Sequence, residues 1–328
     1  MTPRLVSTGS ILVDVVVDVP HLPERGGDVL AAGPRSAPGG GFNVVAAAAR
    51  QGLGCRWVGR HGRGSYGDLV RAALADEAIE VALDRSTDDT DDTDDTGVCF
   101  VLLEPDGERT FVTCAGVDAE LSAADLAGQS VDADDLVYVS GYDLAYPVSG
   151  PPLSAWVAAL SPGPRVVLDP GPLVGEIPAE RLAPVLARTD LLTVNAREAA
   201  WLTGVPEGSA PTATTFAALR ATLSDHALIC VRRGAAGCTI SGPGGEPVDR
   251  PAYDVRAIDA TGAGDAHTGV LIAGLAQGLD PVAAARRANA AAALAVMRPG
   301  PATAPTRLEL DAFLASVAQG AQAGSARE

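Results

Sequence analysis

A nine-residue run near the carboxyl-terminal end of the chain, DATGAGDAH at 259–267, places two carboxylates around a glycine turn. The turn Gly262–Gly264 precedes a long apolar stretch that is typical of a helix. Its backbone N–H groups would then lie at the positive end of a helix dipole, where anions bind. The run therefore suits phosphate binding, and a tight turn with Asp265 as a simple helix cap is the alternative. Asp259 adds a second carboxylate six residues earlier.

A second glycine cluster, PGGGFNVVAAAARQG at 38–52, leads into an alanine-rich amphipathic helix. Asn43 lies in the first turn of that helix, where its amide could cap the helix or recognise a hydroxyl group. Asp14 interrupts an apolar run, SILVDVVVDV, after the first expected strand. On periodicity alone, a solvent-facing position in a strand explains Asp14 equally well.

The composition excludes several functions. All 24 basic residues are arginines, which excludes a Schiff-base lysine, a Walker A lysine and the strand lysine of protein kinases. The net charge of -17 argues against nucleic-acid binding. Five scattered cysteines without a CxxC pair, and no signal peptide, favour a reducing cytoplasmic location. The apolar stretches are too short or too interrupted to span a membrane.

The elements that must position these residues alternate along the chain. Strands are expected at 4–9, 55–60, 135–140, 165–169, 190–194, 227–232 and 253–258. Helices are expected at 42–51, 66–78, 152–160, 180–187, 196–203, 212–223, 264–277, 281–297 and 307–318. Strands that alternate with helices predict an α/β fold of three layers, with a mostly parallel central sheet covered on both faces. We expect one domain over residues 1–328.

Two segments break this rhythm, because neither is followed by a helix of its own. Residues 11–36 are typical of extended segments with Pro and Gly turns, and residues 97–115 of a hairpin. We expect them to form a small β-sheet lid over the active site, and ordinary edge strands are the alternative. Between them lies the acidic tract STDDTDDTDDT at 86–96. It lacks the spacing and glycine of a calcium loop, so a solvated, disordered loop is expected.

Taken together, the motifs resemble the ribokinase, or PfkB-type, family of carbohydrate kinases from about residue 5 to 310. In chain order they are GSILVD, GGGFN, DGERTFVT, LDP at 168–170, NAREAAWLTG at 195–204, VRRGAAGC at 231–238, DATGAGDAHTG at 259–269 and ANAAAALAVMRPG at 288–300. One motif would be weak, whereas this order and spacing are specific. The resemblance implies a ribokinase-like sandwich with a β-sheet lid. It also implies an ATP-dependent kinase that transfers the γ-phosphate to a hydroxyl of a small, ribose- or fructose-like carbohydrate.

The resemblance further implies roles for individual residues. Asp265 would be the general base, and the amides of Gly262, Ala263 and Gly264 would form the anion hole. The implied sugar ligands are Asp14, Gly39, Gly40, Asn43 and Asp259. The implied nucleotide-binding residues are Asn195, Glu198, Arg232, Gly234, Gly237 and Asn289. Glu198 would reach Mg²⁺ through water, Asp259 and Thr261 could join a monovalent-cation (K⁺) site, and the lid could form a homodimer contact.

Several alternatives stay open at this point. A nucleoside kinase of the same family shares these motifs, although we expect few aromatic residues near the pocket for base stacking. A non-catalytic sugar- or nucleotide-binding regulator is a further alternative, which the intact Asp265 and Gly-Ala-Gly turn disfavour. The loop RPGPATAP matches the family's potassium site less well, because Ala304 stands where a hydroxyl would help. His267 stands where an aromatic residue is common. It is expected to be a plain packed or exposed helix residue, and contact with substrate or nucleotide is the alternative.

Overall fold

The computed structural model describes residues 2–85, 95–206 and 211–325, and its centre is a nine-stranded sheet with the order β13-β12-β11-β10-β9-β8-β1-β4-β5. The strands are β1 (Arg4–Ser7), β4 (Gly54–Trp57), β5 (Glu80–Val81), β8 (Leu136–Ser140), β9 (Arg165–Asp169), β10 (Thr189–Asn195), β11 (Leu228–Arg232), β12 (Cys238–Ser241) and β13 (Val248–Arg250). The strands from β5 to β11 in this order run parallel, and β12 and β13 are antiparallel to their neighbours. The predicted mostly parallel sheet is confirmed.

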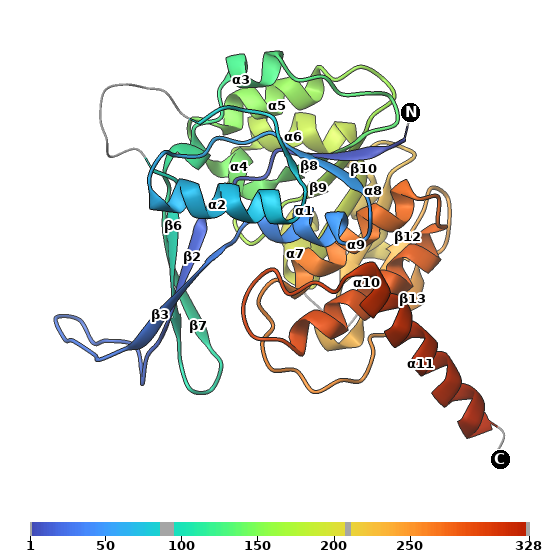
Figure 1. Ribbon diagram of the computed structural model, residues 1–328. Helices are drawn as coiled ribbons and strands as arrows, with labels where there is room; N and C mark the ends of the chain where they lie inside the picture. The colour runs from blue at the N-terminus through green and yellow to red at the C-terminus, as the bar shows by residue number, and fades with distance from the viewer. Residues whose placement is uncertain (1, 86–94, 207–210, 326–328) are drawn as a thin grey trace.

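Helices cover both faces of this sheet (Figure 1). One face carries α1 (Gly41–Ala49), α2 (Ser65–Asp76), α9 (Ala263–Ala276) and α10 (Pro281–Val296). The other carries α3 (Ala123–Ala127), α4 (Gly141–Ala145), α5 (Gly150–Ala158), α6 (Ala179–Arg188), α7 (Ala196–Thr203) and α8 (Ala213–Arg220). The last helix, α11 (Arg307–Ser325), packs against α10 and points away from the body.

The side chains of strand β8 contribute to the hydrophobic cores on both faces of the central sheet. All five residues of β8 are buried, as expected for a central strand with helices on both sides. Leu136 and Tyr138 join the hydrophobic core under α1, α2, α9 and α10. Val137 and Val139 join the core on the opposite face. A continuous apolar run in the sequence therefore supplies two cores by simple alternation.

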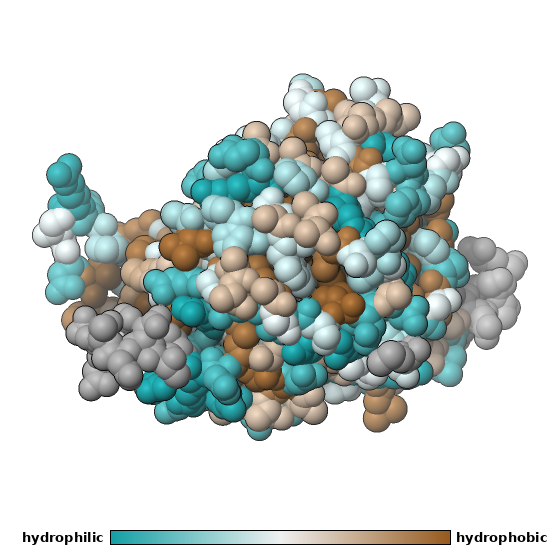
Figure 2. All heavy atoms as spheres, turned by 90° about the horizontal axis from the view of Figure 1, so that it is seen from above, coloured by the Kyte–Doolittle hydropathy of each residue, from teal (hydrophilic) through white to brown (hydrophobic). Residues whose placement is uncertain are grey.

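A separate four-stranded sheet with the order β3-β2-β6-β7 forms the lid. Its strands are β2 (Val13–Asp18), β3 (Ala32–Pro38), β6 (Val98–Leu103) and β7 (Arg109–Cys114). β6 and β7 make the predicted hairpin, and β2 pairs with β6 in parallel. The lid extends away from the body of the protein in both views (Figures 1 and 2). The expected small sheet built from two insertions is confirmed, and β3 continues two residues beyond the predicted bound.

The prediction of a strand at 253–258 is wrong. The β12–β13 hairpin, which the sequence reading missed because both strands are very short, occupies the sheet edge beyond β11. Residues 253–258 therefore leave the sheet. Their end is held instead at the carboxyl end of α10, where the Ile258 and Asp259 N–H groups donate to the Val296 carbonyl at 2.7 and 3.0 Å.

Most of the acidic tract at 86–96 lies outside the described residues, but Asp95 and Thr96 are described. The Asp95 carboxylate accepts hydrogen bonds from the Tyr66 and Gly67 N–H groups, both at 2.8 Å, in the first turn of α2. Thr96 is buried, and its hydroxyl accepts a hydrogen bond from the Gly62 N–H group at 2.9 Å. The expectation of a solvated loop is wrong for these two residues, because free amides at a helix start need acceptors.

Two further features concern the whole described chain. None of its helices over residues 2–85, 95–206 and 211–325 has the length and apolar character that crossing a membrane requires. All five cysteines are free thiols, of which Cys114 is exposed and the other four are buried.

Candidate active site

The glycine turn and the start of α9 lie between two cavities. Gly262 is the N-terminal cap of α9 and has a φ of +71°, a left-handed conformation that favours glycine. Thr261, Gly262 and Asp265 line one cavity of about 320 Å³, which we call the acceptor cavity. Ala260, Ala263 and Gly264 line another of about 600 Å³, which we call the nucleotide cavity. The predicted anion-hole residues are therefore divided between the two cavities: Gly262 lines the acceptor cavity, and Ala263 and Gly264 line the nucleotide cavity.

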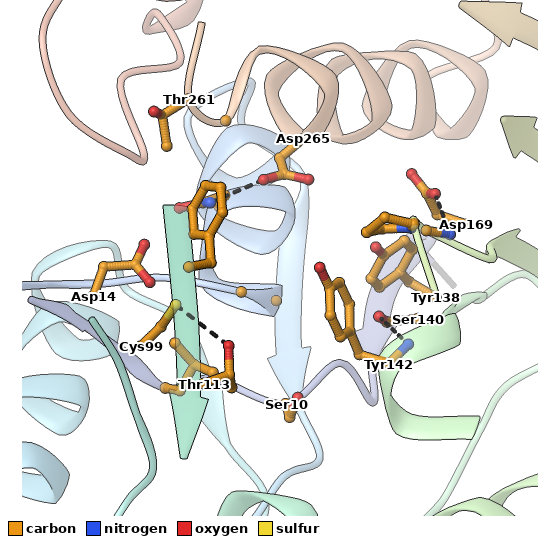
Figure 3. A pocket seen from close by; sticks show the side chains of 18 of the residues that line it. Ser10, Asp14, Cys99, Thr113, Tyr138, Ser140, Tyr142, Asp169, Thr261 and Asp265 are labelled. Carbon is orange, nitrogen blue, oxygen red and sulfur yellow. Dashed lines mark hydrogen bonds between the residues drawn. The ribbon is translucent and has the colours of Figure 1, made fainter. Parts of the chain in front are cut away.

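Two carboxylates point into the acceptor cavity from opposite sides, Asp14 from lid strand β2 and Asp265 from α9 (Figure 3). Burial, together with the negative charge of Asp265, raises the pKa of Asp14 to about 7. Burial also raises the pKa of Asp265, and a hydrogen bond opposes that rise. The donor of this bond is Asn43 Nδ2, at 2.9 Å from Asp265 Oδ2. The solvent-facing alternative for Asp14 is wrong.

The glycine cluster before α1 brings Asp14 and Asn43 to the same cavity. A Cβ atom on Gly39 would lie 2.5 Å from Asp14 Cγ, so the carboxylate packs directly against this glycine. Gly40 has a φ of +60° and lines the cavity as the N-terminal cap of α1. Asn43 does not cap the helix with its side chain, since it is buried and bonded to Asp265. The glycine cluster therefore shapes the acceptor cavity as well as the turn that precedes α1.

Of the predicted sugar ligands, Asp14, Gly40 and Asn43 line the acceptor cavity, whereas Gly39 and Asp259 are not among its described lining residues. Asp259 Oδ1 accepts a hydrogen bond from the Thr261 N–H group at 2.7 Å, and its Oδ2 accepts one from the Gly300 N–H group at 2.8 Å. The guanidinium of Arg109, at the start of lid strand β7, pairs with the same carboxylate. Burial opposes ionisation of Asp259, but these backbone bonds lower its pKa. Asp259 therefore joins the lid to the anion-hole loop.

The nucleotide cavity gathers the residues that the motifs around β10, β11 and α10 single out. Predicted nucleotide-binding residues that line it are Asn195, Arg232, Gly234, Gly237 and Asn289. Gly237 has a φ of +89°, and a Cβ there would overlap the Arg250 carbonyl. Asn289 Nδ2 donates to the Arg250 and Pro251 carbonyls at 2.9 and 3.1 Å, which holds the far wall.

Glu198, predicted to bind the nucleotide, lines the acceptor cavity and belongs to a buried ionic network with Arg232, which lines both cavities. Asn195 and Glu198 form a capping box at the start of α7, with Asn195 Nδ2 donating to Glu198 Oε1 at 2.7 Å. Arg232 Nη1 lies 2.7 Å from Asp169 Oδ2, and Arg232 Nη2 lies 3.5 Å from Glu198 Oε2. Burial, followed by the charge of Asp169, raises the pKa of Glu198 to about 7. The two carboxylates in turn raise the pKa of Arg232 despite its burial.

Sequence reasoning missed several residues of the acceptor cavity. Asp169 enters the sequence reasoning only through the LDP motif, although it is the last residue of β9 and lies at the carboxyl edge of the sheet, where ligands bind in such folds. The expectation of few aromatic residues near the pocket is wrong. The aromatic residues that line it are Phe111, Tyr138, Tyr142 and Tyr146. Tyr142 and Tyr146 follow the carboxyl end of β8, and that position was the signal that could have found them; Tyr138 lies in the middle of the strand.

Comparison with known proteins agrees with this architecture. The family model "pfkB family carbohydrate kinase" matches residues 2–307, so the chain belongs to the PfkB family of carbohydrate kinases. The chain is 32% identical to an uncharacterized sugar kinase of Escherichia coli K12 (YegV) over 311 residues, 92% of this chain and 91% of that protein. It is 30% identical to the ribokinase of Haemophilus influenzae over 321 residues, 96% of this chain and 99% of that enzyme.

Solved structures support the same fold. Ribokinase from Thermotoga maritima is 25% identical, with a TM-score of 0.78 over 96% of this chain and 99% of that one. Fructokinase from Vibrio cholerae, solved with fructose, ADP and a calcium ion bound, is also 25% identical, with a TM-score of 0.73 over 96% of this chain and all of that one. The ribokinase-like fold with its separate lid sheet is thereby confirmed.

Proposed function

We propose that this protein is an ATP-dependent kinase that phosphorylates a hydroxyl group of a small, neutral carbohydrate. The observation that carries the proposal is the position of the 260–265 loop in the walls of both cavities. A nucleotide on one side and a hydroxyl on the other would meet at the amino-terminal end of α9. Phosphoryl transfer depends mainly on such positioning and on stabilising negative charge.

In the proposed reaction, the acceptor hydroxyl attacks the γ-phosphorus of ATP. The new oxygen–phosphorus bond forms as the bond to the β-phosphate oxygen breaks, ADP leaves, and the hydroxyl proton passes to Asp265. The backbone N–H groups of Gly262, Ala263 and Gly264 stabilise the charge on the transferring group. Asn43 holds the Asp265 carboxylate in place through its hydrogen bond at 2.9 Å.

The residues between the cavities also fit a magnesium ion. Mg²⁺ prefers carboxylate and water oxygens, and Glu198 and Asp169 line the acceptor cavity beside Arg232. When bound with ATP, the ion would neutralise phosphate charge, with Glu198 holding it through water. Arg232 offsets part of the carboxylate charge when no nucleotide is bound, and it lines both cavities.

The charges of the acceptor cavity favour a neutral substrate. Among the described residues that line it, Arg232 is the positively charged side chain, and Asp169 and Glu198 already pair with it. Asp14 and Asp265 would repel an acidic sugar. Asn43 Oδ1 is buried without a hydrogen-bond partner in the described chain, so it can accept a bond from a sugar hydroxyl. Asp14 and Gly40 complete this side of the proposed sugar site, and Gly39 packs against the Asp14 carboxylate.

A nucleoside kinase is the second candidate, and the aromatic lining now favours it more than the sequence did. Phe111 and the tyrosines could stack on a base as well as on the apolar face of a sugar. A screen of ATP consumption with pentoses, hexoses, polyols and nucleosides separates the two. Turnover with a free sugar supports the first, and turnover confined to nucleosides supports the second.

The role of Asp265 has its own test. Asp265→Asn should lower turnover by several orders of magnitude and leave ADP binding within about twofold of wild type, because Asp265 does not line the nucleotide cavity. Substantial turnover by a folded Asp265→Asn protein would contradict the assignment. Retained ADP binding without turnover on any acceptor by wild type would instead favour the non-catalytic regulator.

We also propose that the protein forms a homodimer through the lid. Phe100 and Val112 are directly opposed across the β6–β7 hairpin, on the face away from the acceptor cavity, and are 40% and 51% exposed. Apolar surface is visible on the lid at the left of Figure 2. Light scattering should give a dimer mass for wild type and a monomer mass for Phe100→Ser, and a monomeric wild type would contradict this assembly.

A further inference from the structure

A cluster of two cysteines and a histidine lies beside the nucleotide cavity, outside the residues that the proposed reaction uses. Cys230 belongs to β11, Cys238 begins β12, and His267 lies in α9. Their sulfur and imidazole nitrogen atoms all lie within 4.8 Å of one another. Both thiols are 0% exposed and His267 is 4% exposed. These are ligand types that soft metal ions prefer.

The fold brings the three side chains together by strand register and helix phase. β11 and β12 are antiparallel, with Cys230 opposite Ile240 and Arg232 opposite Cys238, so the two cysteines are diagonal neighbours on the same face of the sheet. That face is covered by α9 and α10. His267 follows Asp265 by two residues, about 200° around a helix, and so points away from the acceptor cavity toward this face.

His267 provides an independent indication that a ligand belongs here. Neither of its ring nitrogens has a hydrogen-bond partner of regular geometry among the described residues, although the ring is almost fully buried. A buried polar group without partners costs free energy that a bound ion would recover. The imidazole and the Cys238 thiol lie close enough to interact, but not as a well-formed hydrogen bond.

The two thiols also lie differently from Cys55, another buried cysteine of the same core. Cys230, Cys238 and the His267 ring lie within 4.8 Å of one another, whereas the Cys55 thiol donates to the Val45 and Leu53 carbonyls. The thiolate is the form of cysteine that binds metals.

We propose that Cys230, Cys238 and His267 bind a Zn²⁺ ion, with a fourth position open toward the nucleotide cavity. Two thiolates and one neutral imidazole would balance the charge of the ion, and the protons of the thiols are released on binding. Tetrahedral zinc needs ligand atoms about 3.4–3.8 Å apart, so the side chains must move inward by up to about 1 Å. His267 lines the nucleotide cavity, which supplies an entry path.

The test is a Co²⁺ titration of the reduced full-length protein, because cobalt bound to thiolates absorbs in the near ultraviolet. Wild type should bind one Co²⁺ with thiolate-to-cobalt absorption, and Zn²⁺ should displace it. Cys238→Ser and His267→Phe should weaken binding by about 100-fold. Two controls should bind like wild type: Cys55→Ser removes a buried thiol, and Cys114→Ser removes the exposed one.

Two outcomes of the titration would overturn the proposal: Cys238→Ser binds Co²⁺ as tightly as wild type, or the absorption disappears in Cys114→Ser. If a variant fails to fold, wild type alone decides the matter by alkylation and mass spectrometry. Zn²⁺ should slow the modification of Cys230 and Cys238 relative to Cys99, and equal rates with and without Zn²⁺ would contradict the site. Asp265→Asn should bind Co²⁺ like wild type, so the metal site and the kinase reaction fail or succeed separately.

Discussion

The hydrogen bond from Asn43 to Asp265 should set the pH at which the proposed base works. Asn43 Nδ2 lies 2.9 Å from Asp265 Oδ2 inside the protein, where burial raises the pKa of Asp265 and this bond lowers it. A hydrogen bond to a charged group contributes about 1.5–3 kcal/mol, and one pKa unit equals about 1.4 kcal/mol. Asn43→Leu should therefore disfavour the ionised form of Asp265 by about 1.5–3 kcal/mol and so raise its pKa.

The sign of the effect on activity follows from the role of Asp265. A base acts when it is ionised, so activity falls as the pH drops through its pKa, and a raised pKa moves that fall to higher pH. Asn43→Asp should move it further, because a second carboxylate would then face Asp265. From lowest to highest pH, the acidic midpoints of activity are expected in the order wild type, Asn43→Leu, Asn43→Asp.

The assay is kcat/KM for the acceptor between about pH 5 and pH 9 at saturating ATP, because this parameter reports groups of the enzyme before the acceptor binds. Asp14, with a pKa of about 7, titrates in the same range, so Asp14→Asn must be profiled to separate its contribution. Gln51→Leu is the matched control. Gln51 is a buried amide just after α1, and its Nε2 donates to the Pro305 carbonyl at 2.9 Å. It is not among the described residues that line either cavity. Coincident acidic midpoints for wild type and both folded Asn43 variants would refute the reasoning.

Four other perturbations test separate parts of the structure. Gly39→Ala should raise the acceptor KM by about tenfold, because its Cβ would overlap the Asp14 carboxylate, whereas Gly33→Ala, with nothing within 4 Å, should leave it unchanged; equal KM values would be inconsistent with this contact. Asp95→Ala should lower the free energy of unfolding by about 1–2 kcal/mol in urea, since two amides of α2 lose their acceptor, and an unchanged midpoint would contradict that. Arg109→Ala should make activity depend on K⁺, because the Asp259 carboxylate loses its guanidinium partner and a monovalent cation could take its place. Equal dependence of wild type on K⁺ would contradict this explanation. The melting temperature of the ligand-free protein should fall as the pH rises from about 4 to about 7, because the raised pKa of Asp14 makes the folded chain bind more protons than the unfolded chain in that range. Asp14→Asn should show a smaller fall.

Much of the fold and part of the site could be predicted because local signals coincide with the tertiary arrangement. Asn43 and Asp265 are 222 residues apart, yet each follows a glycine turn at the start of a helix, and such turns meet at one edge of a parallel sheet. The apolar run of β8 likewise predicted a fully buried strand. In both cases the local residue types indicate whether the position lies at the start of a helix or in a buried strand.

Other features depend on where distant elements pack, and no local pattern carries that information. The pairing of Arg109 with Asp259 exists because the lid hairpin reaches the anion-hole loop. Residues 253–258 have the alternation of a strand, but the β12–β13 hairpin occupies the sheet edge that they would need. Cys230 and Cys238 lack metal-binding spacing in the sequence, and only the register of β11 and β12 brings them together.

The division of the two cavities along the chain has a consequence for acceptor preference. Residues 195–296 supply the whole described lining of the nucleotide cavity, whereas most of the acceptor cavity comes from residues 10–172. Substitutions in the amino-terminal half can therefore reshape the acceptor cavity without changing the described lining of the nucleotide cavity. A chimera that joins the first half of one family member to the second half of another, near residue 190, should inherit its acceptor preference from the first parent.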